Sequence, residues 1–224
     1  AAAPPSDGLL AHYDFEQLTG STIVDQSGNG RAASVVGTPA WTGASIRLSG
    51  AANNASRVQL PAGLLAGKNE ATVSVEVKPT AATLTRDNFL WNVGGTSTGT
   101  SGTGSWFVAP RNNLRTAITR TNWSGEQSAG WGQTMTANTW HNVTATIKKN
   151  DDGTSTLRLF VDGVERAVKE NSTIGLADLA DHANTVLGGA AYADSLGFAG
   201  EFAEARIYDR ALGAAEVKEI ADTD

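Results

Sequence analysis

The chain has 224 residues, a formal net charge of -6 and no cysteine. This length allows one large all-β domain or two small ones. The mild acidity argues against nucleic acid or an anionic membrane as the main partner, and the missing cysteines exclude disulfides and thiol chemistry. No apolar run approaches the roughly 18 residues that a membrane-spanning helix requires.

The first residues, AAAPPSDG, are typical of a stub left by a cleaved leader or of an interdomain linker. Composition and charge show no break after them. We therefore assign residues 1–7 to a linker or processed N-terminus and residues 8–224 to one domain. The low lysine content and the abundance of Thr, Ser, Asn and Gly favour a secreted or cell-surface chain.

Alternation of apolar and polar residues predicts β-strands along most of the chain. The longer ones cover residues 9–16, 71–79, 113–119, 141–149 and 155–165, and shorter ones cover 45–49, 57–60, 88–93, 105–110, 184–189 and 202–208. Asp162-Gly163 is a hairpin dipeptide. Only GAAEVKEIAD, residues 213–222, has helical spacing. Short strands between Gly- and Asn-rich turns indicate a sandwich or barrel.

Several motifs in order resemble the laminin-G-like, concanavalin A-like jelly-roll domains of bacteria. They are GLLAHYDFE, VDQSGNG, VQLPAGLLAGKNEATVSVEVKP, NTWHNVTATI, LRLFVDGVE and FAGEFAEARIYDRALGAAEV. The middle section is most similar to versions attached to secreted glycoside hydrolases. The resemblance implies an all-β sandwich of two antiparallel sheets with one short C-terminal helix. It also implies sugar binding on the concave face or its loop rim.

Two tryptophans, Trp123 and Trp131, lie in a segment of small polar residues, NWSGEQSAGW. A flat ring beside hydrogen-bonding groups suits a sugar, because the ring covers C–H groups while polar side chains bind hydroxyls. The alternative is that one ring folds back over the end of the sandwich. The polar candidates near them are Arg111, Asn113, Arg115, Glu126 and Gln127.

Two further tryptophans, Trp91 and Trp106, lie in predicted central strands. If these strands belong to the concave sheet, each ring faces either the core or a ligand, and the sequence leaves both open. Burial is the default for tryptophan in a sandwich, because it removes a large apolar surface from water. We include both among the candidate ligand-binding residues.

A catalytic role as a glycosidase requires a pair of suitably spaced carboxylates, and the sequence has no clear candidate pair. Glycosidases use two that flank the scissile bond, and catalytic relatives carry them in a pattern like Glu-x-Asp-x-x-Glu, which is missing here. Glu201 and Glu204 are three apart, so a regular strand points them to opposite faces unless a bulge intervenes. The expected arrangement is that one of these two glutamates is solvated and the other is paired with Arg206.

The resemblance also implies a structural calcium ion. Glu16 would supply a carboxylate, and the turn from Ser27 to Asn29 would supply carbonyl oxygens, the hard ligands that calcium prefers. Relatives often carry Asp in the last strand, where this chain has Ala203. That departure removes one expected ligand, and DQSGNG also reads as an Asx-type turn without a metal.

The function expected from these features is a non-catalytic, lectin-like module that targets a polysaccharide-degrading enzyme to its glycan. Arabinan, xylan, galactan and fructan all remain open as ligands, and a monomer is expected. The first alternative is a structural or adhesive domain that binds a protein. The second is a glycoside hydrolase, which the missing carboxylate pattern disfavours.

Overall fold

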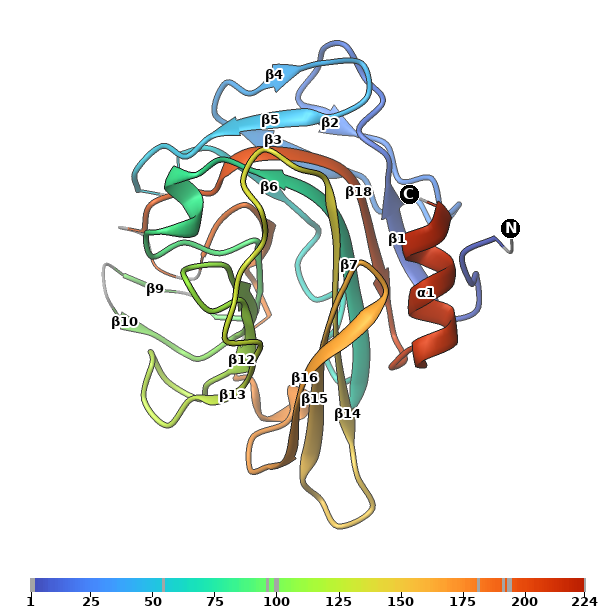
Figure 1. The fold of residues 1–224 in the computed structure, drawn as a ribbon, viewed down its shortest axis with the longest axis vertical. Helices are drawn as coiled ribbons and strands as arrows, with labels where there is room; N and C mark the ends of the chain where they lie inside the picture. The colour runs from blue at the N-terminus through green and yellow to red at the C-terminus, as the bar shows by residue number, and fades with distance from the viewer. Residues whose placement is uncertain are drawn as a thin grey trace.

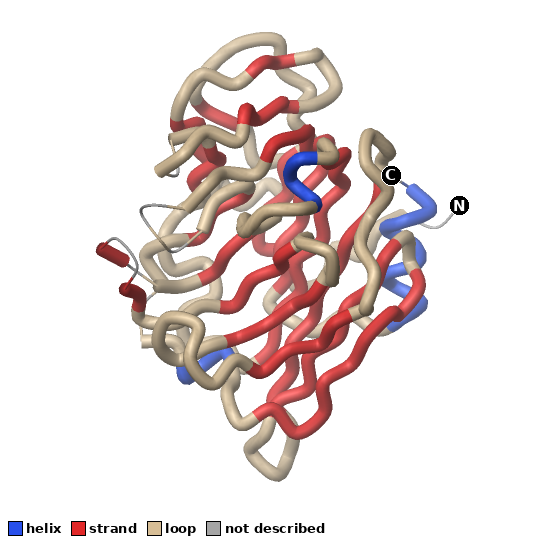
Figure 2. The backbone as a smooth tube through the Cα atoms, turned by 60° about the vertical axis from the view of Figure 1, so that its left-hand side comes forward, coloured by secondary structure: helices blue, strands red, loops and turns tan. Residues whose placement is uncertain are grey.

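Two antiparallel sheets face each other across an apolar core in the computed structural model (Figure 1). The structure describes residues 3–53, 55–95, 97–98, 101–180, 182–190, 192 and 195–223. The predicted all-β jelly-roll sandwich with one C-terminal helix is confirmed. Strands dominate the tube in Figure 2, and helix is confined to short segments.

Sheet A contains the long strands. In spatial order it consists of β16 (Val164–Ser172), β15 (Ser155–Val161), β14 (His141–Lys149), β7 (Glu70–Pro79), β18 (Ala199–Tyr208), β5 (Ile46–Ser49) and β4 (Ala40–Trp41), with β1 (Leu9–Tyr13) also paired to β18. The β15–β16 hairpin turns at Asp162-Gly163 as predicted, and both residues have positive φ, 51° and 81°. Such angles are those of the tight turns that match the strand twist.

Sheet B contains shorter strands. In spatial order it consists of β13 (Gln127–Gly130), β12 (Arg115–Ile118), β11 (Trp106–Ala109), β8 (Trp91–Val93), β17 (Thr185–Leu187), β6 (Arg57–Gln59), β3 (Ala33–Val36) and β2 (Thr22–Ile23). A separate hairpin joins β9 (Ser97–Thr98) to β10 (Ser101–Gly102). Residues 96, 99 and 100, next to this hairpin, lie outside the described part.

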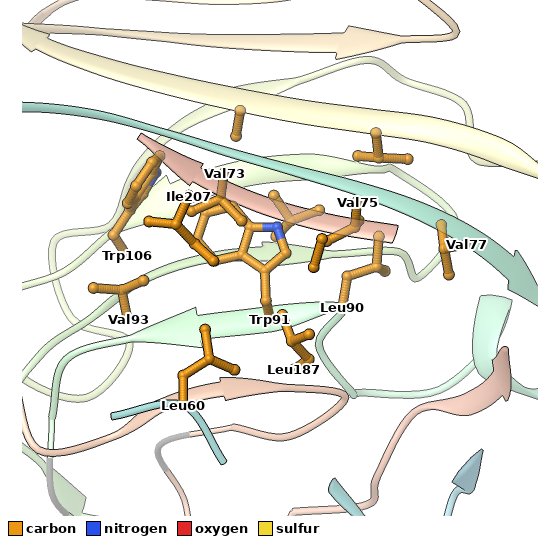
Figure 3. Close-up of a cluster of buried hydrophobic side chains, with 14 of the residues drawn as sticks. Leu60, Val73, Val75, Val77, Leu90, Trp91, Val93, Trp106, Leu187 and Ile207 are labelled. Atoms are coloured by element: carbon orange, nitrogen blue, oxygen red, sulfur yellow. The ribbon is translucent and has the colours of Figure 1, made fainter. Parts of the chain in front are cut away.

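Trp91 and Trp106 lie in the core between the two sheets. Both are buried, with rings packed edge to face 4.7 Å apart between their centroids. Figure 3 shows them among Val73, Val75 and Ile207 of sheet A. Their place among the candidate ligand-binding residues is therefore wrong: both rings point inward, because burying them removes their apolar surface from water.

The outer face of sheet A carries the helix. Helix α1 (Ala214–Thr223) buries Val217 and Ile220 against Phe160 and Tyr208, whose side chains point away from the core between the sheets. The other described helical segments are single turns, η1 (Ala82–Leu84) and η2 (Leu176–Asp178). No helix in the described ranges is long and apolar enough to span a membrane.

The two ends of the chain lie on the same side of the molecule, beside α1 (Figure 1). The C-terminal part of the segment assigned to a linker is hydrogen-bonded to the sandwich. Tyr208 Oη donates to the Pro5 carbonyl oxygen at 2.7 Å, and Arg210 Nε donates to the Asp7 carbonyl at 2.8 Å. The boundary at residue 7 stays a prediction.

Candidate functional site

The outer face of sheet B bears an apolar floor. Along β11 all four residues are buried, but they alternate in direction, with Trp106 and Val108 in the core and Phe107 and Ala109 outside. Phe107 packs on Phe89 with ring centroids 4.6 Å apart. Sheet B therefore has apolar groups on both faces.

Above this floor lies a cavity of about 330 Å³, which we call the aromatic pocket. Its volume lies within the usual range of ligand pockets, and it joins apolar rings to a small set of polar groups, the usual composition of a ligand site. The lining residues are Asp87, Asn88, Phe89, Phe107, Ala109, Arg111, Arg115, Asn122, Trp123, Glu126, Tyr192 and Ser195.

The loop between β12 and β13 brings Trp123 to the pocket. Asn122 and Gly125 have positive φ, 47° and 67°, which Asn and Gly adopt most readily, and Thr121 pairs with Ser124 to close the turn. The side chain of Trp123 at the tip is 67% exposed. Its ring lies 6.4 Å from that of Tyr192, centroid to centroid, with the planes tilted by 52°.

Two arginines of the pocket are each paired with a carboxylate. Arg115 Nε and Nη2 donate to the two oxygens of Glu126 at 2.9 and 3.2 Å, and its guanidinium lies 5.5 Å from the centre of the Phe107 ring. Arg111 Nη1 donates to Asp87 Oδ1 at 2.8 Å. Arg115 faces away from the core, as the strand alternation predicts.

The Tyr192 hydroxyl stays protonated at neutral pH. Burial, and then the negative charge of Glu126, raise the pKa of Tyr192 above its usual value of 10.0. A neutral hydroxyl both donates and accepts hydrogen bonds. Tyr192 therefore presents an apolar ring and a polar group on the same side of the pocket as Trp123.

The structure brings together four of the predicted ligand residues, namely Arg111, Arg115, Trp123 and Glu126. Trp131 is elsewhere: its half-buried ring packs on the core, with the Arg166 guanidinium 5.2 Å from its centre. It is the ring that folds back over the end of the sandwich. Of the two rings predicted as sugar platforms, Trp123 lines the aromatic pocket and Trp131 does not.

Two polar candidates also lie outside the aromatic pocket. Asn113 Oδ1 accepts the backbone N–H of Gly132 at 2.7 Å and so fixes the chain after β13. Gln127 lies in β13 opposite Ile118, and its Nε2 donates to the Gly125 carbonyl at 3.4 Å. Both are corrections, because their amides bind backbone groups instead of facing the cavity.

Sequence reasoning missed the floor and one wall of the pocket. Phe107 lies in SWFVAP, where consecutive apolar residues give no alternation to show which ring faces outward. Tyr192 and Ser195 come from a segment distant in sequence, and Asp87 and Asn88 precede β8. The polar setting of Phe89, in DNF, was the one signal that pointed to a surface position.

The carboxylates of β18 depart from the expected arrangement. In the register of β18 with β7, Glu201 lies opposite Lys78 and Glu204 lies opposite Glu76, because a bulge intervenes between Phe202 and Glu204. Both glutamates therefore share the outer face of sheet A. Glu201 is buried, not solvated. Glu204 contacts Arg206 at 3.6 Å as predicted, and also His12.

Glu201 is held as a carboxylate. Burial raises its pKa, but hydrogen bonds from Ser45 and Lys78, together with the charges of Lys78 and Arg47, lower it further, so that the net pKa lies below the usual 4.5. A general acid of a glycosidase needs a raised pKa. This environment therefore suits an ion pair and not proton donation.

The turn expected to bind calcium is closed by its own hydrogen bonds. The Asp25 carboxylate accepts the backbone N–H groups of His12, Ser27 and Arg31 at 2.9 to 3.0 Å. Asn29 Nδ2 donates to the Leu9 and Leu10 carbonyls, at 2.9 and 3.1 Å. Burial raises the pKa of Asp25, but the hydrogen bonds that its carboxylate accepts outweigh this effect and lower the pKa below its usual 3.8.

These contacts do not fit a calcium site well. Arg31 Nη1 also donates to the Leu10 carbonyl at 2.8 Å, which puts a positive charge at the strand that this turn contacts, an unfavourable neighbour for a cation. Glu16 is exposed. Within the described ranges no three His, Cys, Asp or Glu side chains gather as a metal site. Calcium at this turn stays a prediction.

A model of the concanavalin A-like lectin/glucanases superfamily, Laminin_G_3, matches residues 52–218 of the sequence. The chain belongs to this family. This membership agrees with the two-sheet sandwich and with the resemblance found in the sequence motifs. The comparison with curated proteins gave no match.

Solved structures share the fold at low sequence identity. Domain 4 of AbnA, a GH43 extracellular arabinanase from Geobacillus stearothermophilus, in complex with arabinotriose, aligns with TM-score 0.72 and 21% identity over 95% of this chain and 98% of that one. Trypanosoma rangeli sialidase, in complex with sialic acid, aligns with TM-score 0.72 and 15% identity over 99% of this chain and 34% of the sialidase.

The receptor binding domain of botulinum neurotoxin C/D mosaic serotype also aligns, with TM-score 0.66 and 14% identity over 98% of this chain and 52% of that one. The chain thus spans about a third of the sialidase and about half of the toxin domain. These likenesses establish the fold, and function rests on the site.

Proposed function

We propose that this domain binds a glycan in the aromatic pocket and acts as a non-catalytic module of a polysaccharide-degrading enzyme outside the cell. The observation that carries the proposal is Trp123, a ring 67% exposed at the tip of a loop beside a cavity with paired polar groups. A tryptophan this exposed keeps most of its ring open to solvent and suits stacking on a sugar ring.

The polar groups of the pocket match the hydroxyls of a sugar. Arg115 and Glu126 are fixed by their bidentate contact, so they present unused N–H groups and oxygen lone pairs at set positions. Tyr192 adds a hydroxyl. The similar arabinanase domain, whose structure contains arabinotriose, makes arabinan a natural first ligand to test beside xylan, galactan and fructan.

The absence of catalysis is part of the proposal. Among the described lining residues, the two carboxylates, Asp87 and Glu126, are each paired with an arginine. A retaining or inverting glycosidase needs one carboxyl group that gives up a proton to the leaving group. The pairing suits hydrogen bonding to hydroxyls. Binding without turnover would keep an attached catalytic domain near its substrate.

Affinity electrophoresis over the four polysaccharides tests the proposal. We expect Trp123→Ala to lose at least about tenfold in affinity, the effect of removing a central aromatic contact. Trp140→Ala is the matched control, since Trp140 is 37% exposed and does not line the pocket. It directly precedes β14 of sheet A, and Lys78 Nζ lies 5.3 Å from the centre of its ring. Retention should be unchanged in that variant.

Two outcomes would contradict the proposal. Equal retention of wild type and Trp123→Ala would show that the aromatic pocket is not the binding site. If none of the four polysaccharides retained the wild type, the alternative of a structural or adhesive domain that binds a protein would be favoured. Incubation with labelled oligosaccharides should release no product, and a product that disappears in Glu126→Gln would make the domain an enzyme.

A further inference from the structure

The charges of the described residues that line the aromatic pocket cancel. Within this described lining, the charged side chains are two arginines, Arg111 and Arg115, and two carboxylates, Asp87 and Glu126. Each arginine lies within a direct ion pair with one of the carboxylates. An incoming ligand therefore meets hydrogen-bonding groups without a net charge to attract it.

The Arg115–Glu126 pair is the more firmly held of the two. Only 28% of the Arg115 side chain and 23% of the Glu126 side chain are exposed, and two hydrogen bonds join them. The Phe107 ring lies beneath the guanidinium. A bidentate pair in this half-buried position keeps Glu126 from swinging away to admit another anion.

The Arg111–Asp87 pair is more open, with 48% and 89% of the side chains exposed. Such a surface pair contributes little energy and exchanges readily. Asp87 nevertheless stays at the pocket, so a ligand carboxylate that reached Arg111 would also approach a like charge. The net charge of -6 on the whole chain opposes anions at longer range.

We infer, on the basis of the proposed function, that the aromatic pocket selects neutral glycans and rejects those that carry a carboxylate, such as uronic or sialic acids. A carboxylate there either displaces Glu126 from Arg115 or lies beside it, and both are unfavourable. Hydroxyl groups face no such penalty, because they accept from the arginine N–H groups and donate to the carboxylate oxygens.

Matched trisaccharides test this selectivity by calorimetry on the wild-type domain. α-1,4-Linked galactotriose and α-1,4-linked galacturonic acid trisaccharide differ only in CH₂OH against carboxylate, and xylotriose is compared with its glucuronic acid-substituted form. The neutral member should bind at least about tenfold more tightly. Its affinity should change little between about 50 mM and 500 mM NaCl, because salt screens only charge interactions.

Glu126→Gln tests the cause. The amide keeps the shape but leaves the charge of Arg115 unbalanced, so affinity for the acidic member should rise roughly five- to tenfold relative to the neutral one. Glu165→Gln is the control, since it removes the same charge from the Arg158–Glu165 pair in sheet A. That variant should keep the wild-type ratio.

The outcomes separate this inference from the proposed function. Equal or tighter binding of the acidic member by the wild type, or an unchanged ratio in a folded Glu126→Gln, overturns the selectivity while glycan binding stands. Binding of no trisaccharide of either kind overturns both. The comparison on the wild type remains decisive if Glu126→Gln fails to fold.

Discussion

Trp123 and Trp131 acquire different roles from their positions around β13. Trp123 precedes the strand, in a loop that Asn122 and Gly125 turn away from the sandwich. Trp131 follows it, and its backbone N–H donates to the Leu114 carbonyl at 3.0 Å, which holds the ring over the core. The same type of side chain is thus exposed at a loop tip in one place and covers the core in the other.

Glu201 shows how a buried carboxylate is stabilised on the opposite face. Its Oε1 accepts from Ser45 Oγ at 2.7 Å, and its Oε2 lies 3.0 Å from Lys78 Nζ. Burial alone would disfavour the charged form. The partners reverse this preference, so the folded state binds a proton less readily than the unfolded chain does.

Folding stability should depend on the charge of Glu201 in acid. Because its folded-state pKa lies below the usual 4.5, the stabilisation is present above that value and is lost as pH falls through the folded-state pKa. Glu201→Gln should cost about 1–2 kcal/mol at neutral pH. The difference between the two proteins should shrink in urea unfolding measured at steps below pH 4.5.

The control for this measurement is Glu170→Gln, which changes an exposed carboxylate on β16. It should leave the free energy of unfolding nearly unchanged at every pH. A Glu201→Gln penalty that stays constant down to about pH 3 would mean that shape, and not charge, explains the cost.

At the scale of elements, the strands were predictable wherever one face is apolar and the other polar. Strands β7, β14 and β15 show this alternation because their outer face is largely polar. Strand β13, QSAG, was missed because Ala129 is its one buried residue, so the sequence has no periodic signal. It forms by pairing with β12, which is a long-range effect.

The candidate site was predictable only in part for the same reason. Arg115 was found because it alternates with buried neighbours, and Trp123 because its neighbours are polar. Phe107 was hidden because β11 is apolar on both faces, and Trp106 beside it was chosen instead. Which face a fully apolar strand presents to the core depends on the sheet packed against it, and local sequence does not contain that information.

The turn at residues 25–31 gives a prediction at this scale. The Asp25 carboxylate in this turn already accepts the backbone N–H of Arg31, and the Asn29 and Arg31 side chains donate to the Leu9 and Leu10 carbonyls of β1. We therefore expect millimolar calcium added after chelation to leave the melting temperature unchanged. A ligand that bound only the native state would raise it. An increase that Glu16→Ala abolishes would establish the calcium site that the resemblance implies.

On the scale of the whole molecule, the sandwich separates two surfaces. The aromatic pocket lies on the outer face of sheet B, whereas α1 and both chain ends lie on the side of sheet A (Figure 1). The core that joins them is continuous across the two sheets. A domain attached at either end would therefore leave the pocket open to a glycan.

This arrangement predicts how the domain acts in a fusion. When the domain is joined by a flexible linker to a catalytic domain with matching glycan specificity, hydrolysis of the insoluble polysaccharide should become several-fold faster. The reason is that a tether of this kind gives the catalytic domain an effective concentration of about 1 mM at the glycan. Hydrolysis of soluble oligosaccharides should not change. Trp123→Ala should remove the gain, whereas Glu165→Gln, far from the pocket, should keep it. A gain that survives Trp123→Ala, or that appears equally on soluble substrate, would show that the domain acts on the catalytic partner itself and not by holding it at the glycan.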